Sequence, residues 1–123
     1  MNTAKTRMTV RSITPETAII DVYGDINAAA EAPLMEAYNT ATAQGGNTLL
    51  LNFTGLDYMN STGIGLLVTL LIRASRQKQR LMAYGLSDHY RQVFELTRLN
   101  EAVSIFNDER DALFAAANGL GRS

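Results

Sequence analysis

The most constraining feature of the sequence is a short apolar run, Thr48–Phe53 (TLLLNF), with turn residues on both sides. Gly45 and Gly46 precede the run, and Thr54 and Gly55 follow it. A run of this kind is typical of a strand that is buried on both faces, as in a parallel sheet covered by helices. The sequence therefore predicts a central strand at this position.

The segment before this strand predicts a β-hairpin. Met8–Ile13 and Ala18–Tyr23 are rich in Val, Ile and Thr, which favour strands. Thr14, Pro15 and Glu16 between them are typical turn residues. We therefore expect the chain to enter the sheet through an antiparallel pair.

Helical spacing of apolar residues predicts helices between the strands. One helix is expected from about Ala30 to Ala43, and its apolar face is formed by Leu34, Ala37, Tyr38 and Ala41. A second helix, almost entirely apolar, is expected to begin near Ser61 or Thr62 and to run to about Gln79, with a buried first half and a solvated end. The later elements are expected to be a strand at Leu81–Tyr84, a helix capped by Ser87 with Tyr90, Val93, Phe94 and Thr97 on one face, a strand at Val103–Phe106, and a helix from Asp108 to about Asn118.

Strands that alternate with helices indicate an α/β fold with a mixed, mainly parallel sheet of four or five strands packed with four helices. A chain of 123 residues is long enough for one hydrophobic core, so a single domain is expected over residues 1–123. Its ordered core is expected at about 7–117, with residues 1–6 and the tail after about Ala117 poorly anchored.

Composition narrows the classes of function. The formal net charge is -1, which does not suggest a nucleic-acid-binding surface. No segment approaches the roughly 20 apolar residues that cross a bilayer, and Met1–Arg11 lacks the apolar region of a secretory signal. We therefore expect a cytoplasmic protein. The absence of cysteine and the single histidine, His89, leave little basis for a metal site.

The junction after the central strand is the strongest candidate for a functional site. Ser61 and Thr62 place two hydroxyls where a buried helix begins. The first N–H groups of a helix lack intrahelical partners, so an anionic group such as a phosphate is tolerated there. The alternative is that Ser61 or Thr62 serves only as the N-cap of the helix. Gly63 and Gly65 suggest that another surface approaches the helix backbone closely.

Other chemistries find little support in the sequence. A nucleophile elbow requires Gly-x-Ser-x-Gly, and Met59 occupies the first glycine position. A dinucleotide-binding motif lacks its third glycine, because Val68 stands there. An enzyme that uses Asp57, Tyr58 and Ser61 has no base, metal or cofactor motif to support it.

A basic cluster lies at the end of the second predicted helix. Arg73, Arg76, Lys78 and Arg80 fall within a short polar stretch. A solvated helix end explains such a cluster, and an acidic partner is the alternative.

The segment LLLNFTGLDYMNSTGIGLL, together with YRQVFELTRLNEAVSIFNDERDAL, resembles the STAS domain of bacterial anti-sigma factor antagonists. Members of this family have an Asp-Ser-[Ser/Thr]-Gly turn that opens the second helix. Further along the chain, members of this family share four residue pairs, Val-Phe, Leu-Thr, Ile-Phe and Ala-Leu. The second segment quoted above contains the same four pairs. The resemblance implies a protein-binding switch without catalysis of its own or a cofactor. In its unphosphorylated form, it would bind an anti-sigma factor that has a histidine-kinase-like ATPase fold and would thereby free a sigma factor for transcription.

By motif position, the resemblance makes Ser61 the phosphoacceptor, with Thr62 as the second choice. A serine phosphatase would be a further partner. The patch that docks on the partner would consist of Asp25, Asn27, Asn60, Ser61, Thr62 and Gly63. No metal, nucleic acid or membrane is expected to take part. The alternative is a constitutive STAS scaffold subunit of a multi-protein sensor or transport complex, which is not phosphorylated.

Two positions depart from the family pattern. Asn60 replaces the usual aspartate before the serine, and Asn27 replaces an acidic residue in the early Gly-x-Leu-Asp turn. An asparagine keeps the size and hydrogen bonding of aspartate but removes a charge that would repel a phosphate. Asp25 could substitute for one missing carboxylate, although neighbours in an extended segment point to opposite sides.

Overall fold

The predicted central strand lies in the middle of a five-stranded sheet with the order β1-β2-β3-β4-β5. The structure is a computed structural model that describes residues 5–119. β1 pairs antiparallel with β2, whereas the pairs β2–β3, β3–β4 and β4–β5 are parallel. The strands are β1 (Arg7–Thr14), β2 (Thr17–Ile26), β3 (Thr48–Met59), β4 (Arg80–Tyr84) and β5 (Ser104–Phe106).

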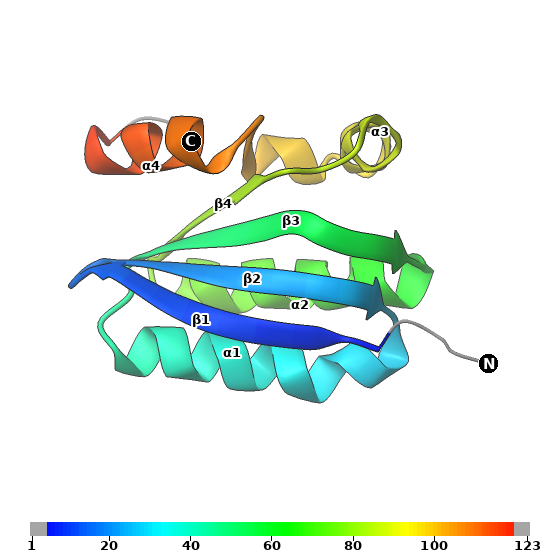
Figure 1. Ribbon diagram of the computed structural model, residues 1–123, viewed down its shortest axis with the longest axis horizontal. Helices are drawn as coiled ribbons and strands as arrows, with labels where there is room; N and C mark the ends of the chain where they lie inside the picture. The colour runs from blue at the N-terminus through cyan, green and yellow to red at the C-terminus, as the bar shows by residue number, and fades with distance from the viewer. Residues whose placement is uncertain (1–4, 120–123) are drawn as a thin grey trace.

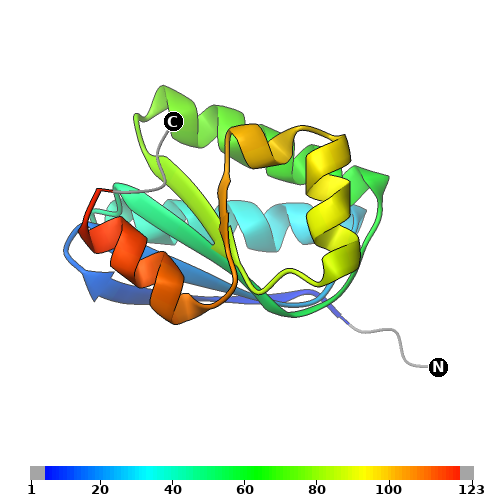
Figure 2. The same ribbon diagram turned by 90° about the horizontal axis from the view of Figure 1, so that it is seen from above.

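Four α-helices within the described residues connect and cover these strands: α1 (Glu31–Ala43), α2 (Ser61–Arg76), α3 (Asp88–Leu96) and α4 (Glu109–Ala117). Two short 3-10 helices, η1 (Ala28–Ala30) and η2 (Leu99–Glu101), complete the chain order. Figure 1 shows α1 and α2 on one side of the sheet and α4 on the other. In Figure 2, α3 and α4 lie apart and are joined by the segment that contains η2 and β5. The predicted single α/β domain with a mainly parallel sheet is confirmed.

The core is divided by the sheet into two clusters. The larger one packs α1, α2 and α3 against one face, and the predicted apolar face of α1 is buried in it. The smaller cluster packs α4 against the other face through Ile19, Leu50, Met82, Tyr84, Ala112 and Ala115. A central strand flanked by both clusters must be apolar on both faces, which explains the run in β3.

β3 is longer than the sequence suggested. It was expected to end at Phe53, before Thr54 and Gly55, but it continues to Met59. The strand stays paired with β2 because register shifts accommodate this stretch. Gly55 marks a close contact rather than a turn, since a Cβ there would lie 2.6 Å from the ring of Tyr23.

α2 also differs from expectation in its end and its burial. It ends at Arg76 rather than near Gln79, and Lys78 then adopts the left-handed conformation with φ of 59°. Burial follows one face along the whole helix, from Gly63 to Ala74, rather than the first half. This is the usual pattern for a helix that lies on a sheet, where one stripe faces the core.

Smaller corrections concern the two ends of the chain and α3. Lys5 and Thr6 are anchored, because a Cβ on Gly24 would lie 2.1 Å from the Lys5 carbonyl and the Thr6 hydroxyl donates to the carbonyl of Asp25. In the predicted loose tail, the Asn118 side chain donates to the Phe114 carbonyl at 2.8 Å, and residues 1–4 and 120–123 lie outside the described residues. Thr97, expected on the packed face of α3, is exposed because it is the C-cap.

No helix in the described part of the chain is long and apolar enough to span a bilayer.

Candidate functional site at the start of helix α2

The site forms where β2 and β3 end side by side. Ile26 pairs with Met59 as the last pair of this parallel ladder. The next residue on each strand is an asparagine that caps a helix: Asn27 Oδ1 accepts the Ala29 N–H at 2.9 Å, and Asn60 Oδ1 accepts the Gly63 N–H at 2.9 Å. The carboxyl ends of parallel strands are where α/β proteins commonly bind ligands and partners.

Asn60, rather than Ser61 or Thr62, is the N-cap of α2, so the expectation that one of these hydroxyls caps the helix is wrong. An asparagine is as good a cap as serine, and here it lies one position earlier. Ser61 is the first helical residue, and both Ser61 and Thr62 are exposed. Within residues 5–119, the Ser61 hydroxyl makes no hydrogen bond, so it has no structural role that a modification would disturb.

Gly63 brings the two asparagine turns into contact. It is buried, and a Cβ there would lie 2.2 Å from the Ile26 carbonyl oxygen and 2.9 Å from Met59 Cγ. The Asn60 N–H also donates to the Ile26 carbonyl, at 3.3 Å. The predicted close approach is therefore confirmed at Gly63. At Gly65, which is exposed, no atom of residues 5–119 lies within 4 Å of a Cβ, so approach by another surface there stays a prediction.

One residue whose side chain stabilises the end of β3 was not identified from the sequence. The hydroxyl of Tyr90, on α3, accepts the Met59 N–H at 2.8 Å. Tyr90 is 8% exposed, so the bond is shielded from water. Its helical spacing marked Tyr90 as a core residue, but no local signal indicated that its hydroxyl would satisfy the end of β3. Beside this junction, Asp57 and Tyr58 are exposed and Asp25 is half-buried.

The electrostatics at the start of α2 favour an anion. The first turn contains no acidic residue. The N–H groups of Ser61 and Thr62 have no acceptor in the part of the chain that the structure describes. Free N–H groups and the positive end of the helix dipole stabilise negative charge within the first turn. No cluster of three or more acidic or histidine side chains in residues 5–119 could hold a metal ion.

The exposed face of α2 continues from Ser61 along the helix. Gly65, Val68 and Ile72 follow at helical spacing, and all three are exposed. Val68 is 38% and Ile72 49% exposed, so both present apolar surface to solvent. Ser61 is therefore the first residue of a weakly polar stripe (Ser61, Gly65, Val68 and Ile72), which we call the α2 stripe.

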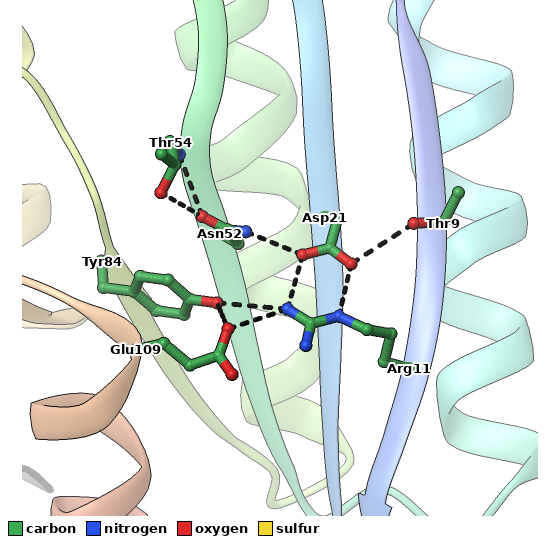
Figure 3. A network of polar contacts seen from close by, with 7 residues as sticks. All are labelled: Thr9, Arg11, Asp21, Asn52, Thr54, Tyr84 and Glu109. Carbon is green, nitrogen blue, oxygen red and sulfur yellow. Dashed lines mark hydrogen bonds and ion pairs between the residues drawn. The ribbon is translucent and has the colours of Figure 1, made fainter.

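A second polar cluster lies on the opposite face of the sheet, under α4 (Figure 3). Arg11 on β1 donates to both carboxylate oxygens of Asp21 on β2, at 2.6 and 2.8 Å. It also reaches Glu109 at the start of α4, at 2.9 Å, and Glu109 accepts the Tyr84 hydroxyl at 2.7 Å. Asn52 donates to Asp21 at 2.7 Å. Through Glu109, the cluster connects α4 to residues of four strands, β1 to β4.

Burial would raise the pKa of Asp21, which is only 3% exposed, but the hydrogen bonds from Arg11, Asn52 and Thr9 and the charge of Arg11 hold it below the usual value. The hydrogen bonds from Arg11 and Tyr84 likewise lower the pKa of Glu109. Burial and the bond to Glu109 raise the pKa of Tyr84. Every group keeps its ordinary charge at neutral pH, so the cluster is a structural latch and not a proton-transfer site.

We expect Arg11→Met to lower the free energy of unfolding by about 2 kcal/mol at pH 7, because Asp21 then stays buried without its cation. The carboxylates with lowered pKa stabilise the fold above their unfolded pKa of about 4, and this contribution disappears as the pH falls through the lower folded values. The loss should therefore shrink below about pH 4. Urea unfolding of the wild-type chain and the variant at pH 7 and at pH 3.5 measures this loss in the free energy of unfolding.

Arg7→Met is the matched control on the same strand. Arg7 is exposed, and its guanidinium lies 4.2 Å from the ring centroid of Tyr23. Such a cation–π contact contributes less than about 1 kcal/mol at an exposed site and involves no carboxylate. An Arg11→Met loss that is the same at both pH values would refute the latch.

Comparison with known proteins gives the family to which this fold belongs. Residues 9–106 match the family model described as "Mlab, STAS domain". The anti-sigma-B factor antagonist of Listeria monocytogenes is 31% identical over 96 residues, which cover 76% of this chain and 84% of that protein.

Solved structures share the fold. SpoIIAA in its unphosphorylated form superimposes with a TM-score of 0.70 at 22% identity, covering 92% of this chain and 99% of that one. SpoIIAA of Bacillus in the phosphorylated form gives 0.69 at 24% identity, covering 89% and 98%.

The chain forms a five-stranded sheet entered by a hairpin, and an exposed serine opens its second helix. The chain belongs to the STAS domain family and is of the anti-sigma factor antagonist type.

Proposed function

We propose that this chain is an anti-sigma factor antagonist whose binding to its partner is controlled by phosphorylation of Ser61. The observation that carries the proposal is the setting of this serine. It is exposed at the first position of α2, its hydroxyl has no partner within residues 5–119, and unpaired N–H groups adjoin it. A phosphate there adds charge without breaking any contact of the fold.

The docking surface combines the α2 stripe with the two asparagine turns. The apolar part of the stripe supplies area that can be removed from water, and Asp25, Asn27, Asn60 and Thr62 supply polar contacts around it. Gly63 is buried, so it holds the turn in place and presents no side chain. Unphosphorylated Ser61 lies where both parts meet.

The proposed partner is an anti-sigma factor with a histidine-kinase-like ATPase fold, which both binds the chain and phosphorylates Ser61. A serine phosphatase restores the binding form. The resemblance of the motif around Ser61 supports this assignment, as does the name of the Listeria relative, an antagonist of an anti-sigma factor. The whole chain acts as one domain in the cytoplasm and performs no catalysis itself.

The asparagines support tolerance of the phosphate. Asn60 and Asn27 make the capping hydrogen bonds that an aspartate would make, but they add no negative charge beside Ser61. A phosphate carries about -1.5 to -2 charges at pH 7, so neighbouring carboxylates would repel it. The loss of two such charges favours the modified form.

The same asparagines favour the second candidate function, a constitutive scaffold subunit. If phosphorylation requires the partner to recognise the usual carboxylates, which this chain lacks, then the chain docks but is not phosphorylated. In that case the asparagine turns and the α2 stripe still form the interface, but binding does not respond to a kinase or a phosphatase.

Site-resolved mass spectrometry of the protein at its native expression level distinguishes the two. We expect one phosphate on Ser61, or on Thr62, with an occupancy that differs between growing and stressed cells. If the phosphate is on Ser61, a Ser61→Ala chain in the same cells should lose the signal and Thr62→Val should keep it, whereas the opposite result would assign the phosphate to Thr62. Protein that is unmodified in every condition, yet copurifies with a fixed partner, would instead establish the scaffold.

A further inference from the structure

A groove of about 890 Å³ lies at the far end of α2 from Ser61. Leu71 and Ile72 of α2, Leu81 of β4 and Ala102 after η2 form its apolar part. Ile72 is 49% exposed, so this part of the groove is open to solvent. Its volume is within the range of ligand sites, and its open shape suits an extended chain better than an enclosed small molecule.

Three cations line the same groove: Arg76, Lys78 and Arg80. Arg76 and Lys78 are exposed, and neither forms an ion pair with any other described residue. Cations near a helix C-terminus interact favourably with the helix dipole, which accounts for Arg76. It does not account for Lys78, which lies beyond the helix in the left-handed conformation, a position where glycine is usual.

The charge on the other side of the groove is already compensated. Glu101 is the acidic residue in the lining, and it pairs with Arg98 at 3.2 Å. The groove therefore presents unmatched positive charge on the α2 side only. This asymmetry gives a bound segment a preferred direction.

The groove shares Ile72 with the α2 stripe, but its cations lie far from Ser61. Ser61 and Arg76 are the first and last residues of α2, and at about 1.5 Å per residue they are roughly 22 Å apart along the helix axis. A phosphate on Ser61 is thus beyond the range of about 10 Å over which exposed charges interact at ordinary ionic strength.

We propose that this groove binds an acidic peptide segment of a partner protein, with an apolar side chain against Ile72 and Ala102 and carboxylates on Arg76 and Lys78. Arginine binds carboxylates through paired hydrogen bonds, which gives the contact direction as well as charge. A nucleic acid strand is a poorer fit, because the lining has no aromatic side chain on which bases could stack. The apolar floor would remain unused by a phosphate backbone.

Selection from a phage-displayed library of random dodecapeptides tests the proposal with the intact chain. The expected result is enrichment of peptides that combine an apolar residue with flanking Asp or Glu. The selection is repeated on the Arg76→Glu/Lys78→Glu double variant, which should not retain these peptides. No enrichment on the wild-type chain relative to the double variant, or enrichment without acidic residues, would overturn the proposal.

Fluorescence anisotropy with one selected peptide then maps the contact. Arg76→Glu should weaken binding at least about tenfold, and Ile72→Ser should also weaken it, because charge and apolar contact are both required. Arg110→Glu, an exposed arginine on α4 outside the groove, is the matched control and should change affinity less than about twofold. Equal losses for Arg76→Glu and Arg110→Glu would show nonspecific attraction and refute the site.

Two further measurements separate this proposal from the proposed switch at Ser61 and from the binding of other anions. Ser61→Asp should leave peptide affinity unchanged, so that failure of the switch and failure of the groove are seen separately. A single-stranded oligonucleotide and vesicles containing phosphatidylglycerol serve as alternative anions. If either of these binds in an Arg76-dependent manner more tightly than the selected peptide, then the groove is not a peptide site.

Discussion

Ser61→Asp is expected to weaken binding to the anti-sigma partner at least about 100-fold, whereas Ser61→Ala should retain wild-type affinity within about threefold. The aspartate places a charge at the centre of the proposed docking surface, where the unmodified chain presents only an exposed hydroxyl. Burying a charge against a surface without a matching cation costs several kcal/mol. Isothermal titration calorimetry with the copurified partner measures both affinities.

The structure allows this pair of variants to be interpreted simply. Because Asn60 caps α2, Ser61→Ala removes no hydrogen bond of the fold and should change stability by less than about 0.5 kcal/mol. Ser61→Asp adds a negative charge to the first turn and should stabilise the helix by a few tenths of a kcal/mol. Thermal unfolding of each variant therefore separates a binding loss from a folding loss. Equal affinities for Ser61→Ala and Ser61→Asp would reject the switch.

The arrangement of elements was predictable because local patterns and the connection rules of α/β folds agree. Period and turn residues identified the hairpin, the central strand and the apolar face of α1, and strands alternating with helices then require a mainly parallel sheet. Ends of elements were less predictable, because tertiary contacts decide them. Gly55 and Thr54 are turn residues in isolation, yet pairing with β2 carries β3 past them to Met59.

The polar latch under α4 was missed, although the sequence contains a signal for it. Asp21 and Asn52 each interrupt an apolar strand, and the register places them opposite each other. A charged residue inside a buried strand requires a partner. Arg11 lies only ten residues before Asp21, on the neighbouring strand of the predicted hairpin, whereas Glu109 is distant in sequence from both and no local pattern connects it to them. Only the folded sheet brings them to α4.

The candidate site was located by its motif, but its internal roles were not. Serine and threonine beside a helix start are common caps, and the sequence offers Asn60, Ser61 and Thr62 in succession. Which of them caps depends on where β3 ends, and that is fixed by the last pair of its ladder with β2. The shift of one residue matters, because it leaves the Ser61 hydroxyl without a hydrogen-bond partner among the described residues.

Gly63→Ala is expected to lower the free energy of unfolding by about 3 kcal/mol, and Gly65→Ala to raise it by about 0.5–1 kcal/mol. The two glycines lie two residues apart on α2, so their helix propensities are comparable. At Gly63 the new methyl group would lie 2.2 Å from the Ile26 carbonyl oxygen, a backbone atom that β2 holds in place. At Gly65 it meets nothing within 4 Å.

Chemical denaturation of the two variants gives the difference directly, and helix propensity cancels in the comparison. The loss at Gly63 must come from separating η1 and the β2 end from the start of α2, so Asn27 and Asn60 should move apart in the variant. The Gly63→Ala chain should therefore also bind the partner more weakly than its fraction of folded protein explains, since the docking surface depends on both turns. Similar stability changes for the two alanines would show that the turns are not in tight contact, and the patch proposed around Ser61 would then lose its basis.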